Sequence, residues 1–337
     1  MDIGDVVFVS TPGTQLTLEG DALRIRVPDR PGRHIVPLLR VDSLVLWHGV
    51  NITPEVLQWC TAHGAHVSWI TQNGKLVASI TGNEPLRAEL RLAQYRAHEN
   101  AAHRLELASA FVAGKLQNYR QLLLKAARDA PSGRQEKLRL VAEDHRQGIS
   151  TLGDASTLTE VLGIEGQSAR SYFGALNELV PSASVGRSRR PPLDPFNCYL
   201  SAGYALLRSA VMAALVHVGL DPAVGFLHGS RGSKPSLALD LMEEMRALLV
   251  DRLIATMFNR NEIKPMYWRE VAGGEVMLSD TGWKHLLGAW VESRQREWPH
   301  LLAGRKVRAA EIPILQARLL ARHLREPMHP YIPWLVA

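Results

Sequence analysis

Cysteine is scarce in this chain, with only Cys60 and Cys198 among 337 residues. Two distant cysteines rule out a disulfide framework and a CxxC metal knuckle, and they are typical of a reducing compartment. We expect both thiols to pack in the protein core.

The sequence also lacks a segment that would target or anchor it. The first ten residues, MDIGDVVFVS, have no basic region before an apolar stretch, so we expect a first strand there and no signal peptide. The best candidate for a membrane span, residues 204–220, is interrupted by Arg208 and His217, which are costly at bilayer depth. The sequence therefore predicts a cytoplasmic protein with no membrane partner.

Composition indicates an ordinary folded protein with a basic surface. The apolar fraction is 46% and the charged fraction 21%, no 20 to 50 residue repeat is visible, and the length suits two domains. The net charge of +6 and the pI near 9.5 permit a polyphosphate partner. Charge alone does not assign one, because many basic proteins bind no nucleic acid.

Residues 1–84 have the pattern of a small β-sheet domain. Two hairpins belong to it, pairing residues 15–19 with 22–27 around Gly20-Asp21 and residues 66–72 with 75–81 around Asn73-Gly74. Thr53, Pro54 and Gly64 delimit one short helix between the hairpins.

Residues 85–337 have helical periodicity and predict a larger, all-α domain. Long helical segments are expected over 86–128 and 135–147. Breaks at residues 131–133, 186–195 and 232–235 divide the region into a bundle. The fold class is therefore α+β, with a boundary after residue 84.

Glu165 is expected at the start of a predicted helix, where it lies on the apolar stripe of that helix. The stripe continues through Ala169, Tyr172, Phe173 and Leu176. A carboxylate there loses hydration, so it needs a cation, hydrogen bonds or a raised pKa. The alternative is a first-turn glutamate stabilised by the helix dipole.

A group of acids follows Ser236, where another helix is predicted. One side of it is apolar, and the other holds Asp240, Glu243, Glu244 and Asp251. No Lys or Arg lies four residues after any of them, and like charges at helical spacing cost about 0.2 to 0.5 kcal/mol per pair. A bound cation would relieve this repulsion, although a solvated acidic face is the simpler alternative.

His228 follows a short apolar stretch and precedes the turn-rich residues 229–235. A histidine in such a place is commonly a hydrogen-bonded core residue, but a neutral imidazole also completes a carboxylate site for Mn²⁺ or Mg²⁺. Arg231 and Lys234 in the same loop could hold a phosphate beside the metal. The predominance of carboxylates argues against zinc.

Two further patterns are rejected as sites. Residues 229–234, GSRGSK, lack the four-residue gap of a phosphate-binding P-loop, and Pro235 replaces its Ser or Thr. His323 and His329 are six residues apart with a proline between them, which is no helical ligand spacing. We expect these histidines to be surface or structural residues.

Two basic clusters accompany the acids. Arg187, Arg189 and Arg190 lead into a proline-rich connection, and Arg305, Lys306 and Arg308 form the second cluster. Either cluster could be a solubilising loop, but two of them around an acidic site favour a track for DNA.

Three ordered segments carry a resemblance to a known family. They are IEGQSARSYF (164–173), SRRPPLDPFNCYLSAGYALL (188–207) and GFLHGSRGSKPSLALDLMEEMR (225–246). After a small β domain, this order closely resembles the CRISPR-associated integrases of spacer acquisition, also called endonucleases. The likeness covers nearly the whole chain, including AFVAGKLQNYRQLLL (110–124) and QARLLARHL (316–324).

The resemblance implies a Mg²⁺ or Mn²⁺ site made by Glu165, His228 and Glu243. Asp240 would be a fourth ligand or a supporting partner, and Glu244 has weaker support. The third acid is Asp in some members of the family and Glu in others, so Glu243 fits the pattern.

The resemblance also implies an activity and partners. In the family, a 3′-hydroxyl of a short foreign DNA duplex attacks a phosphodiester of the repeat array, which serves antiviral defence, and water in place of that hydroxyl gives nuclease activity. The expected partners are protospacer and repeat DNA, a second copy bound through residues 1–84, and the small second adaptation protein. The alternatives are a noncatalytic DNA-binding scaffold and a hydrolase of small phosphoesters.

Overall fold

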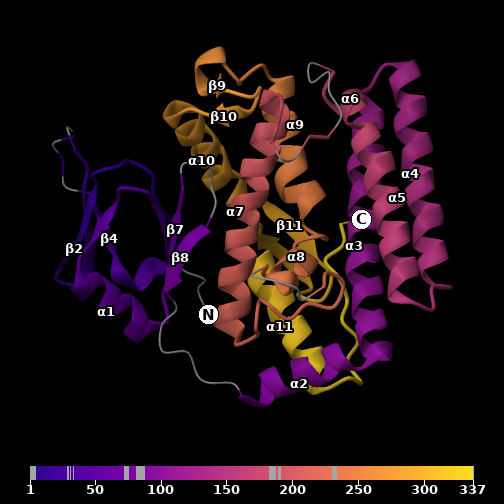
Figure 1. Cartoon of the computed structure of the whole chain (residues 1–337), viewed down its shortest axis with the longest axis horizontal. Coiled ribbons are helices and arrows are strands. Elements are labelled where there is room, and N and C mark those ends of the chain that lie inside the picture. The colour runs from indigo at the N-terminus through magenta and orange to yellow at the C-terminus, as the bar shows by residue number, and fades with distance from the viewer. Residues whose placement is uncertain are drawn as a thin grey trace. The chain divides into compact units, whose positions relative to one another are not determined.

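The computed structural model describes residues 5–28, 30, 32, 34–71, 76–80, 88–181, 187–188, 191–229 and 234–336. The chain divides into two compact units, residues 1–86 and residues 87–337 (Figure 1). The expected boundary after residue 84 falls within residues 81–87, which lie outside the described ranges.

The first unit contains two four-stranded sheets. In one, the strand order is β1 (Asp5–Val9), β5 (Val41–Trp47), β7 (His66–Ile70) and β8 (Leu76–Ile80). In the other, it is β4 (His34–Pro37), β3 (Ala22–Arg26), β2 (Gln15–Glu19) and β6 (Asn51–Ile52). Both predicted hairpins form, as β2–β3 and β7–β8, but each belongs to a different sheet.

Local sequence signals explain the turns of this unit. Gly20 joins β2 to β3 with a φ of 59°, a conformation that favours glycine. The predicted short helix is α1 (Pro54–His63), which begins after Thr53 and ends at Gly64 with a φ of 72°. The turn at Asn73-Gly74 lies outside the described residues.

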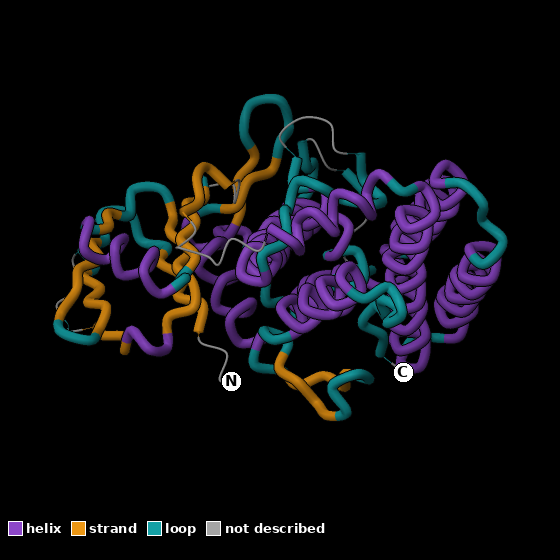
Figure 2. The backbone as a smooth tube through the Cα atoms, turned by 90° about the horizontal axis from the view of Figure 1, so that it is seen from below, coloured by secondary structure: helices purple, strands orange, loops and turns teal. Residues whose placement is uncertain are grey.

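The second unit is mostly helical, as Figure 2 shows. Its helices are α2 (Ala88–Glu99), α3 (Ala101–Asp129), α4 (Ser132–Leu152), α5 (Leu158–Gly174), α6 (Leu176–Leu179), α7 (Pro195–Val218), α8 (Ser236–Leu241), α9 (Arg252–Asn259), α10 (Asp280–Arg294) and α11 (Ile312–Arg325). The second unit also has a π-helical turn at Arg246–Asp251 and a 3₁₀ turn at Pro265–Tyr267. The first unit has a 3₁₀ turn at Leu38–Arg40.

This unit adds four short strands to the predicted bundle. β9 (Trp268–Glu270) pairs with β10 (Val276–Leu278), and β11 (Glu297–His300) pairs with β12 (Arg305–Arg308). The predicted α+β class is confirmed, with these strands added to its helical part. Each strand is only three or four residues long, too short for a visible alternation in the sequence.

The predicted helix over 86–128 is two helices. Asn100 ends α2 and caps α3, because its side chain accepts hydrogen bonds from the backbone N–H groups of Ala102 and His103. Figure 1 shows α3, α4 and α5 side by side.

A buried apolar cluster joins the segments that carry Lys115 and two of the predicted ligands, Glu165 and His228. It includes Leu116 of α3, Val161 of α5 and Leu227 of the loop before α8. These residues neighbour or lie one turn from Lys115, Glu165 and His228. Packing in the core therefore fixes the backbones from which the polar side chains project.

Helix α7 is long and apolar enough, by length and composition, to cross a membrane, and half of its most apolar window is buried in the unit. Its fully covered residues include Tyr199, Leu200, Leu207 and Leu215. This burial is that of a core helix, and one such helix is weak support for a membrane span.

Candidate active site

Glu165 lies in the middle of α5 and does not open that helix. Thr157 caps α5 and forms a capping box with Glu160, eight and five residues before Glu165. The alternative of a first-turn glutamate is therefore wrong for Glu165, and it is Glu160 that holds that place. The Glu165 side chain is 23% exposed.

Lys115 of α3 lies between two of the predicted ligands. Its Nζ forms an ion pair with Glu165 Oε1 and lies 2.7 Å from Glu243 Oε2. The Lys115 side chain is only 3% exposed, so its charge is compensated by these two carboxylates and hardly at all by water. One ammonium thus brings together two acids from segments 78 residues apart.

Glu243 is buried between two cations. Its Oε1 lies 2.9 Å from Arg246 Nη2, while its Oε2 contacts Lys115 Nζ at an angle that makes no hydrogen bond. Burial alone would raise the pKa of Glu243, but the charges of Arg246 and Lys115 hold it at about 2. Glu243 is therefore ionised across the physiological range.

Asp240 is fully buried at the end of α8 and accepts four hydrogen bonds. Its oxygens accept from the backbone N–H groups of Phe226, Leu227 and His228 at 2.5, 3.0 and 2.9 Å. The fourth hydrogen bond is donated by the Nδ1–H of His228, at 2.6 Å. Gly225 permits this approach, because a Cβ there would lie 2.5 Å from Asp240 Oδ2.

The contact with Asp240 defines the chemistry of His228. A buried carboxylate accepts, so Nδ1 carries the proton and Nε2 is left as the nitrogen that can bind a metal. Burial would lower the pKa of His228, but its hydrogen bond to Asp240 and the charges of Asp240 and Glu243 raise it above the usual value. His228 lies in the loop between α7 and α8.

The other two acids of the predicted acidic face point into the core. Glu244 accepts hydrogen bonds from Gln316 Nε2, the Tyr331 hydroxyl and the Trp334 N–H. Asp251 accepts from the hydroxyls of Tyr172 and Tyr204 at 2.9 and 2.5 Å.

A solvated acidic face is therefore wrong for Asp240, Glu243, Glu244 and Asp251, which are all at most 2% exposed. The assumption that no cation compensates them is also wrong for Glu243. Arg246, three residues on, pairs with it, and both side chains are largely buried, at 13% and 3% exposed.

The predicted DNA-binding residues are only partly within the described ranges. Arg189, Arg190 and Arg231 lie outside them, and Lys234 is exposed just before α8. Arg187 donates to Asn197 Oδ1 at 2.7 Å and lies 5.6 Å from the ring centres of Phe173 and Tyr204. This placement indicates packing, and DNA contact by Arg187 stays a prediction.

The remaining basic and histidine residues have local partners. Arg305 and Arg308 of β12 both pair with Glu311, whereas Lys306 is exposed. His323 is buried and its Nδ1 hydrogen-bonds the His329 carbonyl oxygen, as expected for a structural histidine.

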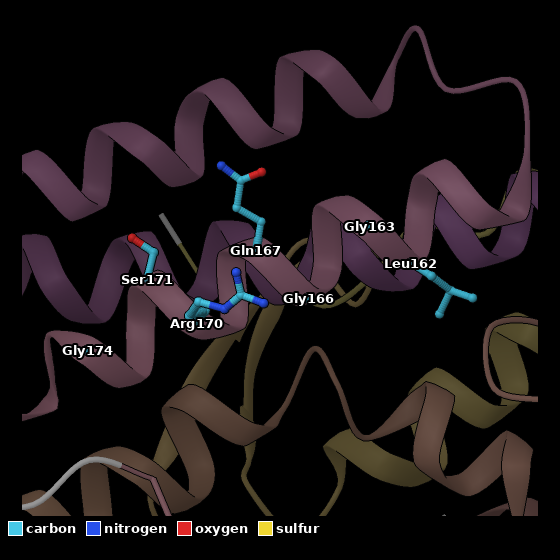
Figure 3. Close-up of a pocket in the computed structure, with 7 residues that line it drawn as sticks. All are labelled: Leu162, Gly163, Gly166, Gln167, Arg170, Ser171 and Gly174. Carbon is cyan, nitrogen blue, oxygen red and sulfur yellow. The ribbon is translucent and has the colours of Figure 1, made fainter.

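An open hollow runs along the exposed face of α5, and Glu165 is not among the residues that line it. It is lined by Leu162, Gly163, Gly166, Gln167, Arg170, Ser171 and Gly174 (Figure 3). A Cβ placed on any of the three glycines would meet nothing within 4 Å. The small residues and Arg170 therefore leave space and a cation at the exposed surface of α5.

Sequence reasoning missed Lys115 and Arg246. Arg246 lies three residues after Glu243, so the usual pairing distance of four residues does not reveal it. Lys115 had a visible signal, because it interrupts the buried stripe of Phe111, Leu116 and Tyr119 on α3. A lysine in such a stripe needs a buried acid as partner.

Within the described ranges, no three His, Cys, Asp or Glu side chains already surround one point as metal ligands. Glu165 and Glu243 meet at the Lys115 ammonium, and His228 interacts electrostatically with Glu243. Two carboxylates and an imidazole are nevertheless a donor set that suits a hard divalent ion. The buried Oε2 of Glu243, which accepts no hydrogen bond, supports this fit.

The fold and the site together define an α+β protein whose helical unit gathers acids, a histidine and cations in one place. The family described as CRISPR associated protein Cas1 matches residues 7–292. The CRISPR-associated endonuclease Cas1 2 of Rhodospirillum rubrum is 37% identical over 340 residues, which are 98% of each chain. The chain belongs to the CRISPR-associated Cas1 family.

Solved structures agree with this membership. A casposase bound to its integration product is 25% identical, with a TM-score of 0.83 over 96% of this chain and 91% of that one. A Cas6-RT-Cas1–Cas2 complex has a TM-score of 0.81 over 99% of this chain and 36% of that one, at 21% identity. At that identity the second likeness shows the fold alone.

Proposed function

We propose that this protein is a metal-dependent DNA integrase and endonuclease of CRISPR adaptation. The observation that carries the proposal is the convergence of Glu165 and Glu243 on one buried ammonium, next to a histidine oriented by Asp240. The named endonuclease relative and the casposase with its integration product support the same class of reaction.

Glu165, Glu243 and Nε2 of His228 would hold the Mg²⁺ or Mn²⁺ ion. When bound, such an ion polarises a phosphoryl oxygen and lowers the pKa of an attacking hydroxyl. Asp240 is best suited to a supporting role, because its two oxygens already accept four hydrogen bonds. It holds the imidazole ring and its tautomer in place.

The chain's own residues would orient the substrate for attack by a DNA 3′-hydroxyl. Arg246 keeps Glu243 ionised and positioned. The reaction exchanges one phosphodiester for another, and the displaced oxygen leaves as a new 3′-hydroxyl. Water as the attacking group gives hydrolysis at the same site.

We infer that DNA, a second copy of the chain and the small second adaptation protein are the partners, and that the protein acts in the cytoplasm. The solved Cas1–Cas2 complex supports the protein partner, and the excess of Lys and Arg supports DNA. We expect the second copy to bind through the first unit.

The direct test is joining of an oligonucleotide 3′ end into supercoiled plasmid with and without Mn²⁺. We expect Glu165→Ala, His228→Ala and Glu243→Ala each to reduce joining at least ~100-fold while circular dichroism still shows a helical fold. Glu136→Gln, on the exposed side of α4, is the matched control.

Wild-type joining rates in any of the three alanine variants would contradict the assigned site. Metal-independent binding of DNA with no joining by the wild-type protein would instead favour a noncatalytic scaffold.

A further inference from the structure

Lys115 contacts both ligand carboxylates that the proposed function assigns. The atoms it contacts are Glu165 Oε1 and Glu243 Oε2. The second oxygen of Glu243 is already paired with Arg246. Both oxygens of Glu243 therefore face a cation of the protein itself, so a metal ion that binds Oε2 must compete with Lys115 for it.

We propose that Lys115 is an internal cation that holds Glu165 and Glu243 together in the metal-free protein and leaves them when a divalent ion binds. The inference rests on the proposed metal site, because it concerns how that site is filled. It assigns to Lys115 a positioning role and no contact with the reacting atoms.

Electrostatics in the buried site favours such an exchange. Without a counter-charge, Glu165 and Glu243 would repel each other with little water to screen them, since the Glu243 side chain is only 3% exposed. Lys115 supplies one positive charge, and a divalent ion supplies two. A divalent ion in place of the ammonium is therefore attracted more strongly by the same two carboxylates. Its measured affinity is nevertheless reduced, because it must first displace the ammonium from them.

Lys115 also lies near an aromatic ring that stabilises its charge. Its side chain is a flexible four-carbon stem, unlike the rigid fork of an arginine. The Tyr119 ring centre lies 5.6 Å from Nζ, and an aromatic face stabilises a nearby cation. Arg246 and Lys115 contact different oxygens of Glu243, so Arg246 can stay on Oε1 as Lys115 leaves Oε2.

The test compares Mn²⁺ binding to EDTA-treated wild-type protein and Lys115→Met, without DNA, by titration calorimetry and by the thermal shift on adding MnCl₂. We expect the variant to bind Mn²⁺ more tightly, by roughly tenfold or more, because the competing charge is gone. We also expect its metal-free form to melt at a lower temperature and its shift with Mn²⁺ to exceed that of the wild type.

Lys125→Met is the matched control. It removes the same charge from α3, ten residues and about 15 Å further along the helix, from an exposed position. Its Mn²⁺ affinity should equal that of the wild type. If Lys115→Met does not fold without metal, Lys115→Gln, whose amide can still donate to one carboxylate, gives the same comparison.

Equal or weaker Mn²⁺ binding by the Lys115 variant, with binding by the wild type intact, overturns the exchange and leaves the proposed metal site standing. Absence of Mn²⁺ binding from both proteins overturns the metal site and the exchange with it. Binding by the variant alone supports the exchange in its strongest form.

Discussion

Four buried carboxylates within residues 240–251 have different roles because they have different partners. Asp240 accepts from three backbone N–H groups and His228, whereas Glu243 faces Lys115 and Arg246. Glu244 and Asp251 have neutral donors instead, and burial raises their pKa values to about 8 and about 6. Of these four, Glu243 is the one that forms ion pairs with Lys and Arg side chains.

This distinction could not be predicted from the sequence. The acids, Glu165 and His228 are recognisable by type, spacing and resemblance. Their partners are not, because Lys115 is 50 residues from Glu165 and Gln316 is 72 residues from Glu244. Such contacts depend on how the helices pack, and helical periodicity carries no information about them.

Asp240→Asn tests the supporting role of that carboxylate. An asparagine has one acceptor oxygen where Asp240 has two, and each Asp240 oxygen accepts two hydrogen bonds, so two of the four donors would face an amide N–H₂ group and the loop that orients His228 would be held less firmly. We expect Mn²⁺-dependent joining to fall roughly 10- to 100-fold. Joining rates over a Mn²⁺ titration measure it, with Asp129→Asn at the exposed end of α3 as control.

Glu244 gives a prediction for pH. Its pKa is raised from 4.5 to about 8 in the folded protein, so the folded state holds a proton that the unfolded state has lost. This contribution to stability is complete below pH 4.5 and is lost as the pH rises through about 8, at about 1 kcal/mol per pH unit. We expect the melting temperature to fall between pH 6.5 and 8.5.

Glu244→Gln should flatten that fall, because glutamine does not titrate. Asp251, with a pKa near 6, loses most of its own contribution below this window and leaves the comparison clear. Parallel melting curves of the wild type and Glu244→Gln across these pH values would contradict the raised pKa.

At the scale of elements, the C-terminal segment after α11 is attached to α3 and to the turn that bears Glu243. Asn118 donates to the carbonyl oxygens of Glu244 and Trp334 and accepts from Val336 N–H. Trp334 is 2% exposed, and its indole donates to the Pro299 carbonyl. Residues 331–336 therefore support the backbone of the candidate site from behind.

The helices themselves were predictable where capping signals agree with periodicity, as in α1 and α7. The break at Asn100 was not, because helix formers continue through it and only the two hydrogen bonds to its side chain show the cap. The attachment of residues 331–336 has no periodic signal at all.

Gly114→Ala tests this attachment. A Cβ at Gly114 would lie 2.7 Å from Pro333 Cβ and 3.0 Å from Glu244 Cβ, so the segment must move. Overpacking costs about 1 to 3 kcal/mol, against a helix-propensity gain of about 1 kcal/mol. We expect a net loss of stability in urea, of up to about 2 kcal/mol.

Gly163→Ala on α5 is the counterpart, because nothing lies within 4 Å of its added Cβ. This variant should gain up to about 1 kcal/mol, since only the propensity changes. If Gly114→Ala were as stable as Gly163→Ala, the close packing of residues 331–336 on α3 would be disproved.

At the scale of the whole molecule, the division into a β unit and a helical unit follows from the change of hydrophobic period near residue 85. The placement of every assigned ligand in the helical unit follows from the same division. The net charge of +6 belongs to this scale too, because the attraction of a duplex sums over all exposed cations.

We therefore expect affinity for duplex DNA, measured by fluorescence anisotropy between 50 and 300 mM salt, to fall steeply, with a slope of log K on log salt near −0.9 per neutralised phosphate. Arg189→Gln and Arg190→Gln should each make the slope less steep by about one. Arg187→Gln should also lower the melting temperature, because the Arg187 guanidinium lies 5.6 Å from the ring centres of Phe173 and Tyr204. A salt-independent complex would contradict the basic track. Equal slopes in the wild type and both single variants at 189 and 190 would place the track elsewhere, with exposed Lys234 and Lys306 the next positions to neutralise.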